Sequence, residues 1–239
     1  MAVQAVIFDW GGTLSNWALV EFHEIWRLAA HHLSPYLGEP PEELEQRLAR
    51  VELDAWAQMD HDHQAFTFRD LVNRASVALG ADVADAIIDE ASDHYLGSWL
   101  PHIEHDPEAA PLLEALRERG IRTGLLSNTH WPADFHERML ERDGLAHLLD
   151  ARVYTSDLAV TKPHPDAFRA ALDSVEVADP SRAVFVGDRL FDDIFGAQRV
   201  GMRAVHRPNP DVPPYEVQPD AVIERLSELL PLVEGWRQG

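Results

Sequence analysis

The sequence predicts an α/β protein, built on a doubly wound parallel sheet with an α-helical domain inserted near its N-terminus. Three observations carry this prediction. A short apolar, β-branched run stands at residues 3–8, an uninterrupted helical pattern fills residues 17–99, and helices alternate with strands after residue 101. Repeated strand–helix alternation is typical of a parallel sheet covered on both faces. We therefore expect a core of residues 1–16 and 106–239 and a helical cap of residues 17–105.

The first strand is predicted at residues 3–8, which read VQAVIF. Such a continuous apolar run suits a strand buried on both faces of a parallel sheet. Asp9 follows directly, and the pair Gly11-Gly12 then breaks the strand.

About four helices are predicted for the inserted cap, because apolar residues recur there at helical spacing. One of them starts after Pro40-Pro41. The next is expected to begin with a capping box of Thr67 and Asp70 and to stop at Gly80. Asp82 is expected to cap a further helix.

The rest of the chain is predicted as alternating elements. Helices are expected at residues 109–119, 132–142, 165–174, 190–200 and 221–233, and strands at 121–126, 152–155, 183–186 and 203–206. Polar residues follow three of the strands: Asp9, Ser127-Asn128 and Asp188. Parallel sheets bind ligands at the carboxyl ends of their strands. We therefore expect these side chains to converge, although they are scattered along the sequence.

Composition excludes several classes of function. Of 239 residues, 20 are Lys or Arg and 41 are Asp or Glu, so the net charge is −21. Such an acidic protein repels phosphate backbones and anionic membranes, so we expect neither nucleic-acid nor membrane binding. The absence of cysteine excludes disulfides, thiolate metal sites and cysteine nucleophiles. The sequence contains no apolar run long enough to cross a membrane, and its first predicted strand begins too early to leave room for a signal peptide. We therefore expect a cytoplasmic protein. The oligomeric state is not predicted.

One basic residue differs from all the others. Lys162 is the only lysine, and the remaining 19 basic residues are arginines. A bias toward arginine accounts for the arginines but not for the exception. Lysine offers a compact point charge that arginine does not reproduce, so Lys162 is a candidate functional residue.

The strand-end carboxylates indicate a metal site. Asp9 and Asp188, together with Asp192 or Asp193, would repel one another at one edge of the sheet unless a cation lay between them. Ligation by oxygen alone favours Mg²⁺ over softer metals. Mg²⁺ and a lysine beside a free carboxylate form a suitable arrangement for phosphoryl transfer.

Four stretches, in order and at matching spacing, resemble the haloacid dehalogenase (HAD) superfamily of hydrolases, in particular its phosphoglycolate-phosphatase-like members. They are VIFDWGGTL from Val6, GLLSNT from Gly124, VTKPHPDAF from Val160 and FVGDRLFDDIFGA from Phe185. The resemblance covers essentially the whole chain. It implies a Rossmann-like core with a helical cap inserted between the first two stretches.

The resemblance also implies roles for individual residues. Asp9 matches the nucleophile that forms an aspartyl-phosphate, Ser127 the hydroxyl that binds the phosphoryl group, and Lys162 the lysine that pairs with both. Gly12, Thr13 and Asn128 match positions that contact the substrate. The implied Mg²⁺ ligands are Asp9, the carbonyl of Gly11, Asp188 and Asp193, with Asp192 as the alternative to Asp193.

Gly11 departs from the family pattern. HAD phosphatases carry an aspartate there, which protonates the leaving group and later activates water. Haloacid dehalogenases carry an aromatic residue at that position and lack the full acidic pair of the last stretch, so dehalogenation is disfavoured. Phosphonatases need a cap lysine, and residues 17–105 contain none.

The predicted function is therefore Mg²⁺-dependent hydrolysis or transfer of a phosphoryl group from a small phosphorylated metabolite. An alternative is a catalytically weakened relative that binds ligands or regulates. Gly11 favours that alternative, and the set of Asp9, Ser127, Lys162 and Asp188 opposes it. His130, near the end of the second stretch, is a further candidate for a substrate contact or a replacement proton donor.

Overall fold

A parallel sheet of six strands, in the order β3-β2-β1-β4-β5-β6, organises the larger part of the molecule. The structure is a computed structural model that describes residues 2–238. Every pair of neighbouring strands is parallel, which confirms the predicted fold class. The strands are β1 (Ala5–Phe8), β2 (Arg122–Ser127), β3 (Ala151–Tyr154), β4 (Ala183–Gly187), β5 (Arg203–His206) and β6 (Ala221–Val222).

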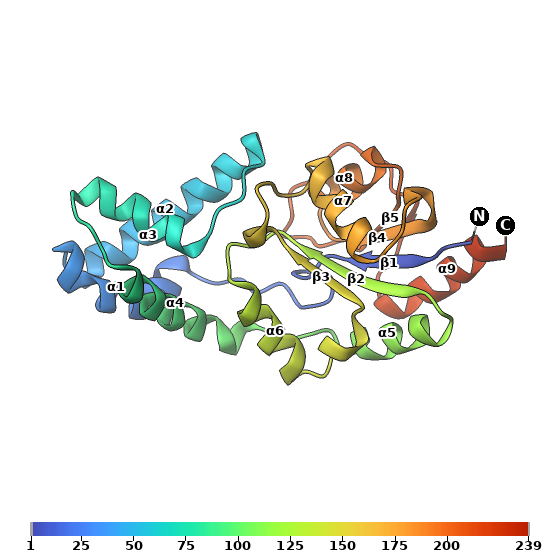
Figure 1. Cartoon of the computed structure of the whole chain (residues 1–239), viewed down its shortest axis with the longest axis horizontal. Coiled ribbons are helices and arrows are strands. Elements are labelled where there is room, and N and C mark those ends of the chain that lie inside the picture. The colour runs from blue at the N-terminus through green and yellow to red at the C-terminus, as the bar shows by residue number, and fades with distance from the viewer. Residues whose placement is uncertain (1, 239) are drawn as a thin grey trace.

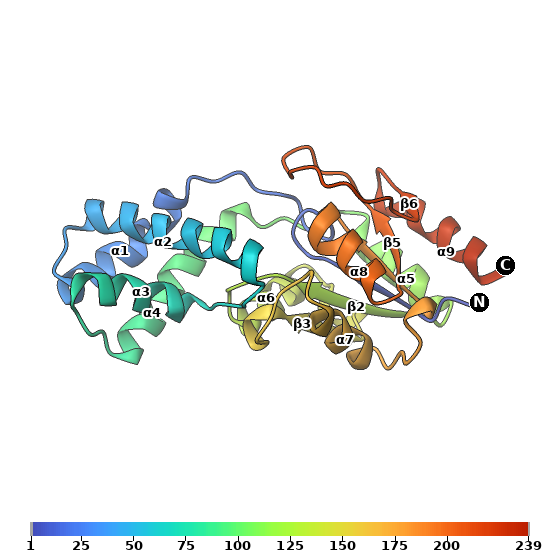
Figure 2. The ribbon, with the colours of Figure 1, turned by 90° about the horizontal axis from the view of Figure 1, so that it is seen from above.

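Helices cover both faces of this sheet (Figure 2). Along β1, Val6 and Phe8 belong to the hydrophobic cluster that includes α5 (Ala109–Glu118), α6 (Ala133–Arg142) and α9 (Leu229–Gln238). Ala5 and Ile7 belong to a second cluster, with α7 (Pro165–Ser174) and α8 (Gly196–Arg199). The alternation follows from the two-residue period of a strand.

Four further helices lie together at the end of the molecule remote from both termini (Figure 1). We call them the cap. They are α1 (Phe22–Leu37), α2 (Pro41–Asp62), α3 (Phe68–Leu79) and α4 (Asp85–Trp99). The predicted capping box of Thr67 and Asp70 is present, and Gly80 ends α3 at a φ of 66°. The domain limits drawn from the sequence stay a prediction.

The loop after α2 joins the cap to the core through backbone hydrogen bonds. The amide of Thr161 donates to the carbonyl of His63 at 2.9 Å, and that of Ala65 donates to Ala159 at 3.1 Å. Gln64 and Val160 thereby form an isolated antiparallel bridge. The segment of the cap at residues 63–65 is thus attached to the loop that precedes Lys162.

Two expected features were wrong, and one expected helix is present but of mixed type. Helix α4 begins at Asp85 with Ala84 as its N-cap, so Asp82 does not cap it. The helix expected at 221–233 is instead strand β6, which pairs with β5, followed by α9. Residues 190–200 form a π-helix (Leu190–Phe195) before α8, because the amides of Asp193 and Ile194 both donate to the carbonyl of Arg189. Within residues 2–238, none of the helices combines the length and apolarity that crossing a membrane requires.

Candidate active site

The strand order explains how the candidate site forms. β1 lies between β2 and β4, so Asp9, Ser127 and Asp188, at or just beyond the ends of these strands, meet at one edge of the sheet. Asp9 is 6% exposed, Ser127 3% and Asp188 1%. Burial of two carboxylates and a hydroxyl at one edge of a sheet is costly unless partners compensate it.

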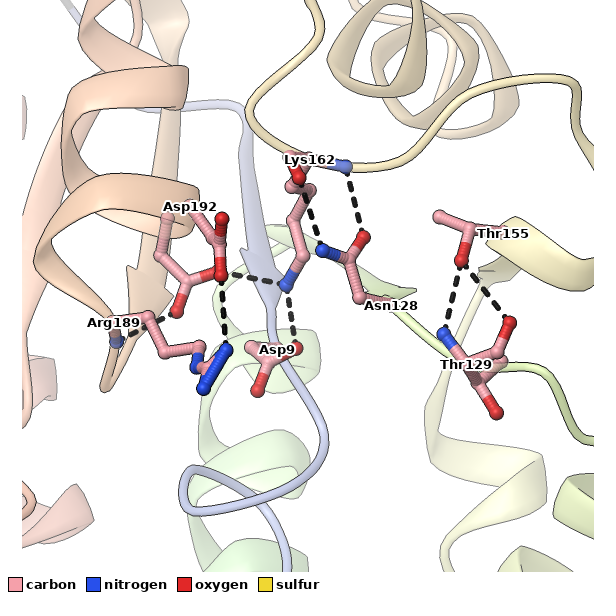
Figure 3. Close-up of polar contacts among 8 residues, drawn as sticks. Asp9, Asn128, Thr129, Thr155, Lys162, Arg189 and Asp192 are labelled. Atoms are coloured by element: carbon pink, nitrogen blue, oxygen red, sulfur yellow. Dashed lines mark hydrogen bonds and ion pairs between the residues drawn. The ribbon is translucent and has the colours of Figure 1, made fainter. Parts of the chain in front are cut away.

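Lys162 supplies the compensating positive charge. Its Nζ donates to Asp9 Oδ1 at 2.5 Å (Figure 3). It also donates to Asp193 Oδ1 at 2.7 Å, and the lysine side chain is 1% exposed. The side-chain amide of Asn128 holds the backbone of Lys162. Its oxygen accepts from Lys162 N at 2.8 Å, and its nitrogen donates to Lys162 O at 3.1 Å. The only lysine of the chain thus bridges two carboxylates of the candidate site.

Three carboxylates gather around this lysine. One oxygen from each of Asp9, Asp188 and Asp193 lies within 4.8 Å of the others. Burial, and then repulsion by neighbouring carboxylates, raises the pKa of Asp188 above its ordinary value. Asp188 Oδ1 is buried and has no hydrogen-bond partner among the described residues. Excess negative charge and an unpaired buried oxygen fit a divalent cation that prefers oxygen ligands.

Asp192 and Asp193 face different partners. Asp193 Oδ2 accepts from the backbone amide of Arg189 at 2.9 Å, and its Oδ1 accepts from Lys162. Asp192 Oδ2 instead accepts from the guanidinium of Arg189 at 3.2 Å (Figure 3). The structure therefore brings Asp193 into the cluster and leaves Asp192 beside it.

Two glycines allow these carboxylates to approach the backbone. Gly12 has a φ of 80°, and a Cβ there would overlap the carboxylate of Asp188. A Cβ on Gly187 would overlap the carboxylate of Asp193. Gly11 differs, because its φ is not positive and an added Cβ would come no closer than 4.0 Å to the ring of Trp17. Nothing in the local backbone or packing requires glycine at position 11.

A cavity of about 440 Å³ opens between the cap and this edge of the sheet. Asp9, Ser127 and Lys162 line it on the core side, as do Gly11 and Asn128. Gly12 and Thr13 do not line it, and the buried hydroxyl of Thr13 has no partner among the described residues. The remaining wall is largely aromatic, made by Trp10, Trp17, Phe22, Trp56, Trp99 and Trp131.

His130 lines the cavity and is buried among aromatic side chains. Its ring stacks on Phe66 with centroids 5.4 Å apart, and its Nε2 lies 3.2 Å from the hydroxyl of Tyr95. Burial lowers the pKa of His130 to about 3, so the imidazole is neutral near pH 7. A neutral imidazole is a weak acid, so this environment disfavours His130 as the replacement proton donor, a role that stays untested.

Sequence reasoning missed Glu52, a buried carboxylate of α2 at the cavity wall. It accepts from Trp26 Nε1 at 2.7 Å and from the hydroxyl of Tyr95 at 2.9 Å. Burial raises the pKa of Glu52 from 4.5 to about 7, against the lowering effect of these hydrogen bonds. The signal was available, because Glu52 shares the apolar stripe of Leu48, Ala55 and Met59 at helical spacing.

The raised pKa of Glu52 makes stability depend on pH. Its protonated form is favoured in the folded protein, so this contribution is full below pH 4.5 and is lost as the pH rises through 7. Glu52→Gln should abolish this pH dependence. The unfolding free energy of the variant, measured relative to that of wild type, should therefore rise by up to about 3 kcal/mol between pH 4.5 and 8. Chemical denaturation of both proteins across this range measures the difference. Parallel pH profiles would show that Glu52 stays ionised.

Mg²⁺ should raise the melting temperature, because a cation that binds only the folded state stabilises it by mass action, by about 2.7 kcal/mol at 100 times its Kd. Asp188→Ala should abolish that rise, since it removes a carboxylate of the cluster. Asp192→Ala is the matched control and should keep it, because Asp192 pairs with Arg189. Thermal melts of the three proteins with and without Mg²⁺ measure this rise. An unchanged response in Asp188→Ala would remove Asp188 from the ligands.

A family model described as a haloacid dehalogenase-like hydrolase matches residues 3–201, most of the chain. The chain belongs to this family. Its predicted HAD membership and its assignment as an enzyme are thereby confirmed.

Individual HAD relatives agree with the family assignment. The chain is 31% identical to a glyceraldehyde 3-phosphate phosphatase of Methanopyrus kandleri over 65% of this chain and 67% of that protein. It is 36% identical to a phosphoglycolate phosphatase of Rhodospirillum rubrum over 56% of this chain and 58% of that protein. Across the first three curated relatives the chain spans 67%, 45% and 59% of their lengths.

Solved HAD structures match over nearly the full length. A HAD phosphatase from Thermococcus onnurineus gives a TM-score of 0.67 at 26% identity, over 98% of this chain and 100% of that chain. A 2-haloacid dehalogenase from Pseudomonas syringae also gives 0.67, at 29% identity, over 98% and 99%. The fold is therefore shared by phosphatases and dehalogenases, and only the site can separate the two activities.

Proposed function

We propose that this HAD hydrolase is a Mg²⁺-dependent phosphatase that cleaves a small phosphate monoester through an aspartyl-phosphate on Asp9. The observation that carries the proposal is Lys162, whose Nζ lies between Asp9 and Asp193 in a cluster of three carboxylates. The lysine, and a divalent cation that the carboxylates would hold, suit a phosphate whose charge must be neutralised. The names of the relatives support a phosphatase.

The chemistry of the first step follows from the positions of the residues. An oxygen of Asp9 attacks the phosphorus, and the bond between phosphorus and the ester oxygen breaks. Lys162 favours the ionised form of Asp9 and neutralises the phosphoryl oxygens, and the hydroxyl of Ser127 donates to one of them. Asp9, Asp188 and Asp193, with the carbonyl of Gly11, would hold Mg²⁺, which would neutralise phosphate charge.

Water completes the reaction by attacking the phosphorus of the aspartyl-phosphate, which releases inorganic phosphate and restores Asp9. In both steps a proton must move: to the leaving oxygen in the first, and from water in the second. Gly11 offers no side chain for either transfer. We therefore expect the first step to be slow for esters whose alcohols are poor leaving groups, and the second step to be slow for every ester.

The test is to trap the intermediate. Wild-type protein with Mg²⁺ and an aryl phosphate labelled at phosphorus should retain label after acid quench, and Asp9→Asn should retain none. Asp60→Asn is the matched control, because Asp60 lines the same cavity outside the carboxylate cluster. Equal labelling of Asp9→Asn and wild type would place the nucleophile elsewhere.

Gly11 also favours a second candidate, a ligand-binding or regulatory protein of the same fold. That candidate predicts that phosphate esters raise the melting temperature but are never cleaved. A phosphatase screen run beside thermal melts separates the two functions.

A further inference from the structure

We propose that the ester cleaved at this site carries an uncharged aromatic group, which occupies the cavity beneath the cap. This inference rests on the proposed phosphatase function and specifies its class of substrate. It draws on the aromatic wall of the cavity, on the charges around it, on its exposed rim and on Gly11.

The wall of the cavity contains aromatic rings that pack against one another. The ring of Trp131 lies 5.0 Å from that of Trp99 and 5.8 Å from that of Trp10, tilted by 54° and 76° respectively. Trp10 is fixed from behind, because its Nε1 donates to His105 Nε2 at 3.0 Å. Aromatic side chains bind aromatic ligands by offset and edge-to-face contacts, so this wall suits a flat ring.

Charge on the cap side of the cavity disfavours a second anionic group on the substrate. Its two strongly basic residues, Lys162 and Arg189, both belong to the core, and both bond to carboxylates. On the cap side no lysine or arginine of the described chain lines the cavity, whereas Glu52 and Asp60 do. A carboxylate or second phosphate placed against the cap side would lose its hydration and meet no lysine or arginine of the cap.

A cationic group gains little from the same wall. Glu52 already accepts hydrogen bonds from Trp26, Trp56 and Tyr95. Its raised pKa also leaves it partly protonated near pH 7. Asp60 is exposed, where solvent screens its charge.

The rim of the cavity exposes apolar side chains that have no apolar cover in the structure. Trp17 is 44% exposed, Leu53 45% and Leu19 76%, and all three line the cavity. Exposed apolar groups gathered at a cavity mark a site for an apolar ligand. They come from two segments, the loop before α1 and helix α2, so both segments present exposed apolar side chains to the cavity.

Gly11 gives a separate reason to expect an aromatic leaving group. Phenolate leaves without a proton far more readily than an alkoxide does, so the absence of an acid at position 11 costs an aryl ester least. The open space above Gly11 ends at the Trp17 ring, 4.0 Å from where a Cβ would stand. The missing acid and the aromatic rim therefore occur side by side.

The experiment separates the pocket from leaving-group chemistry by using esters that share a CH₂–O–P linkage. The three probes are 2-naphthylmethyl phosphate, phosphoglycolate and phosphocholine. We expect a KM for the naphthyl ester at least about tenfold lower than for the other two, a conservative value for burial of a ring against hydrophobic walls. A KM for phosphoglycolate or phosphocholine equal to or below that of the naphthyl ester would overturn the proposal.

Two variants connect the preference to the cavity. Trp17→Ala should raise the KM for 2-naphthylmethyl phosphate several-fold, whereas Tyr36→Ala, a comparably exposed aromatic of the cap outside the cavity, should not. Leu53→Arg, which adds a cation at the rim, should lower the KM for phosphoglycolate. Unchanged values in both Trp17→Ala and Leu53→Arg would contradict the proposed location.

Failure of the phosphatase function is distinguished by binding without turnover. If no ester is cleaved, 2-naphthylphosphonate should still quench the tryptophan fluorescence of the wild type, and Trp17→Ala should weaken its binding. That result would retain the aromatic ligand and reject the phosphatase. Absence of binding would overturn the proposal itself.

Discussion

Gly11→Asp should increase kcat/KM for alkyl phosphates, toward the ~10²–10⁴-fold that a positioned acid–base group typically supplies. The carboxyl would stand beside the nucleophile, where it can protonate the leaving oxygen and then activate water. The backbone permits the change, because φ at Gly11 is not positive and an added Cβ has no heavy atom closer than 4.0 Å. Steady-state kinetics with glycerol phosphate and with phenyl phosphate measure the gain, which should be larger for the alkyl ester.

Gly11→Asn is the matched control for this gain of function. Asparagine has nearly the same shape as aspartate but cannot exchange a proton, so it should leave kcat/KM near the wild-type value. The lifetime of the aspartyl-phosphate offers a second readout, since it should shorten only in Gly11→Asp. If both variants fold and neither differs from a wild type that already cleaves alkyl phosphates rapidly, another residue supplies the proton.

Lys162→Arg should reduce kcat by about 10²–10³-fold, the loss typical of removing one preorganised donor from a transition state. The Nζ of Lys162 is within 2.7 Å of oxygens of both Asp9 and Asp193, and the side chain is buried. The longer, planar guanidinium cannot occupy that position without displacing one of the carboxylates. Phosphatase assays beside thermal melts separate lost activity from lost folding.

Lys162→Met provides the comparison for stability. It removes the charge and leaves two buried carboxylates without their partner, which should cost about 3–5 kcal/mol of unfolding free energy. Lys162→Arg keeps the charge and should retain more of that stability. Activity of Lys162→Arg within a few-fold of wild type would mean that the single lysine is an accident of composition.

Part of this architecture could be read directly from the sequence. Asp9, Ser127 and Asp188 follow buried strands, and neighbouring parallel strands bring such residues together irrespective of their separation along the chain. The sequence favoured Asp193 over Asp192 because Asp193 lies five residues after Asp188. In the structure Asp193, and not Asp192, accepts a hydrogen bond from Lys162.

Other features depend on contacts that no local pattern reports. Strand β6 is two residues long and exists through its pairing with β5, which the helical spacing of the following apolar residues concealed. The aromatic wall combines Trp17 from the loop before α1, Trp99 from the end of α4 and Trp131 from the core. Each of these tryptophans is consistent with ordinary packing until the fold places them around one cavity.

The backbone bridge between Gln64 and Val160 ties access to the site to the position of its lysine. A rigid displacement of the cap must release the amide of Thr161, the residue before Lys162, from the carbonyl of His63. We therefore expect opening of the cavity to loosen the lysine loop, and the deuterium exchange rate of the Thr161 amide measures how often this occurs. Exchange of the Thr161 amide that is faster than that of the sheet amides, and slower when a ligand is bound, would support this coupling.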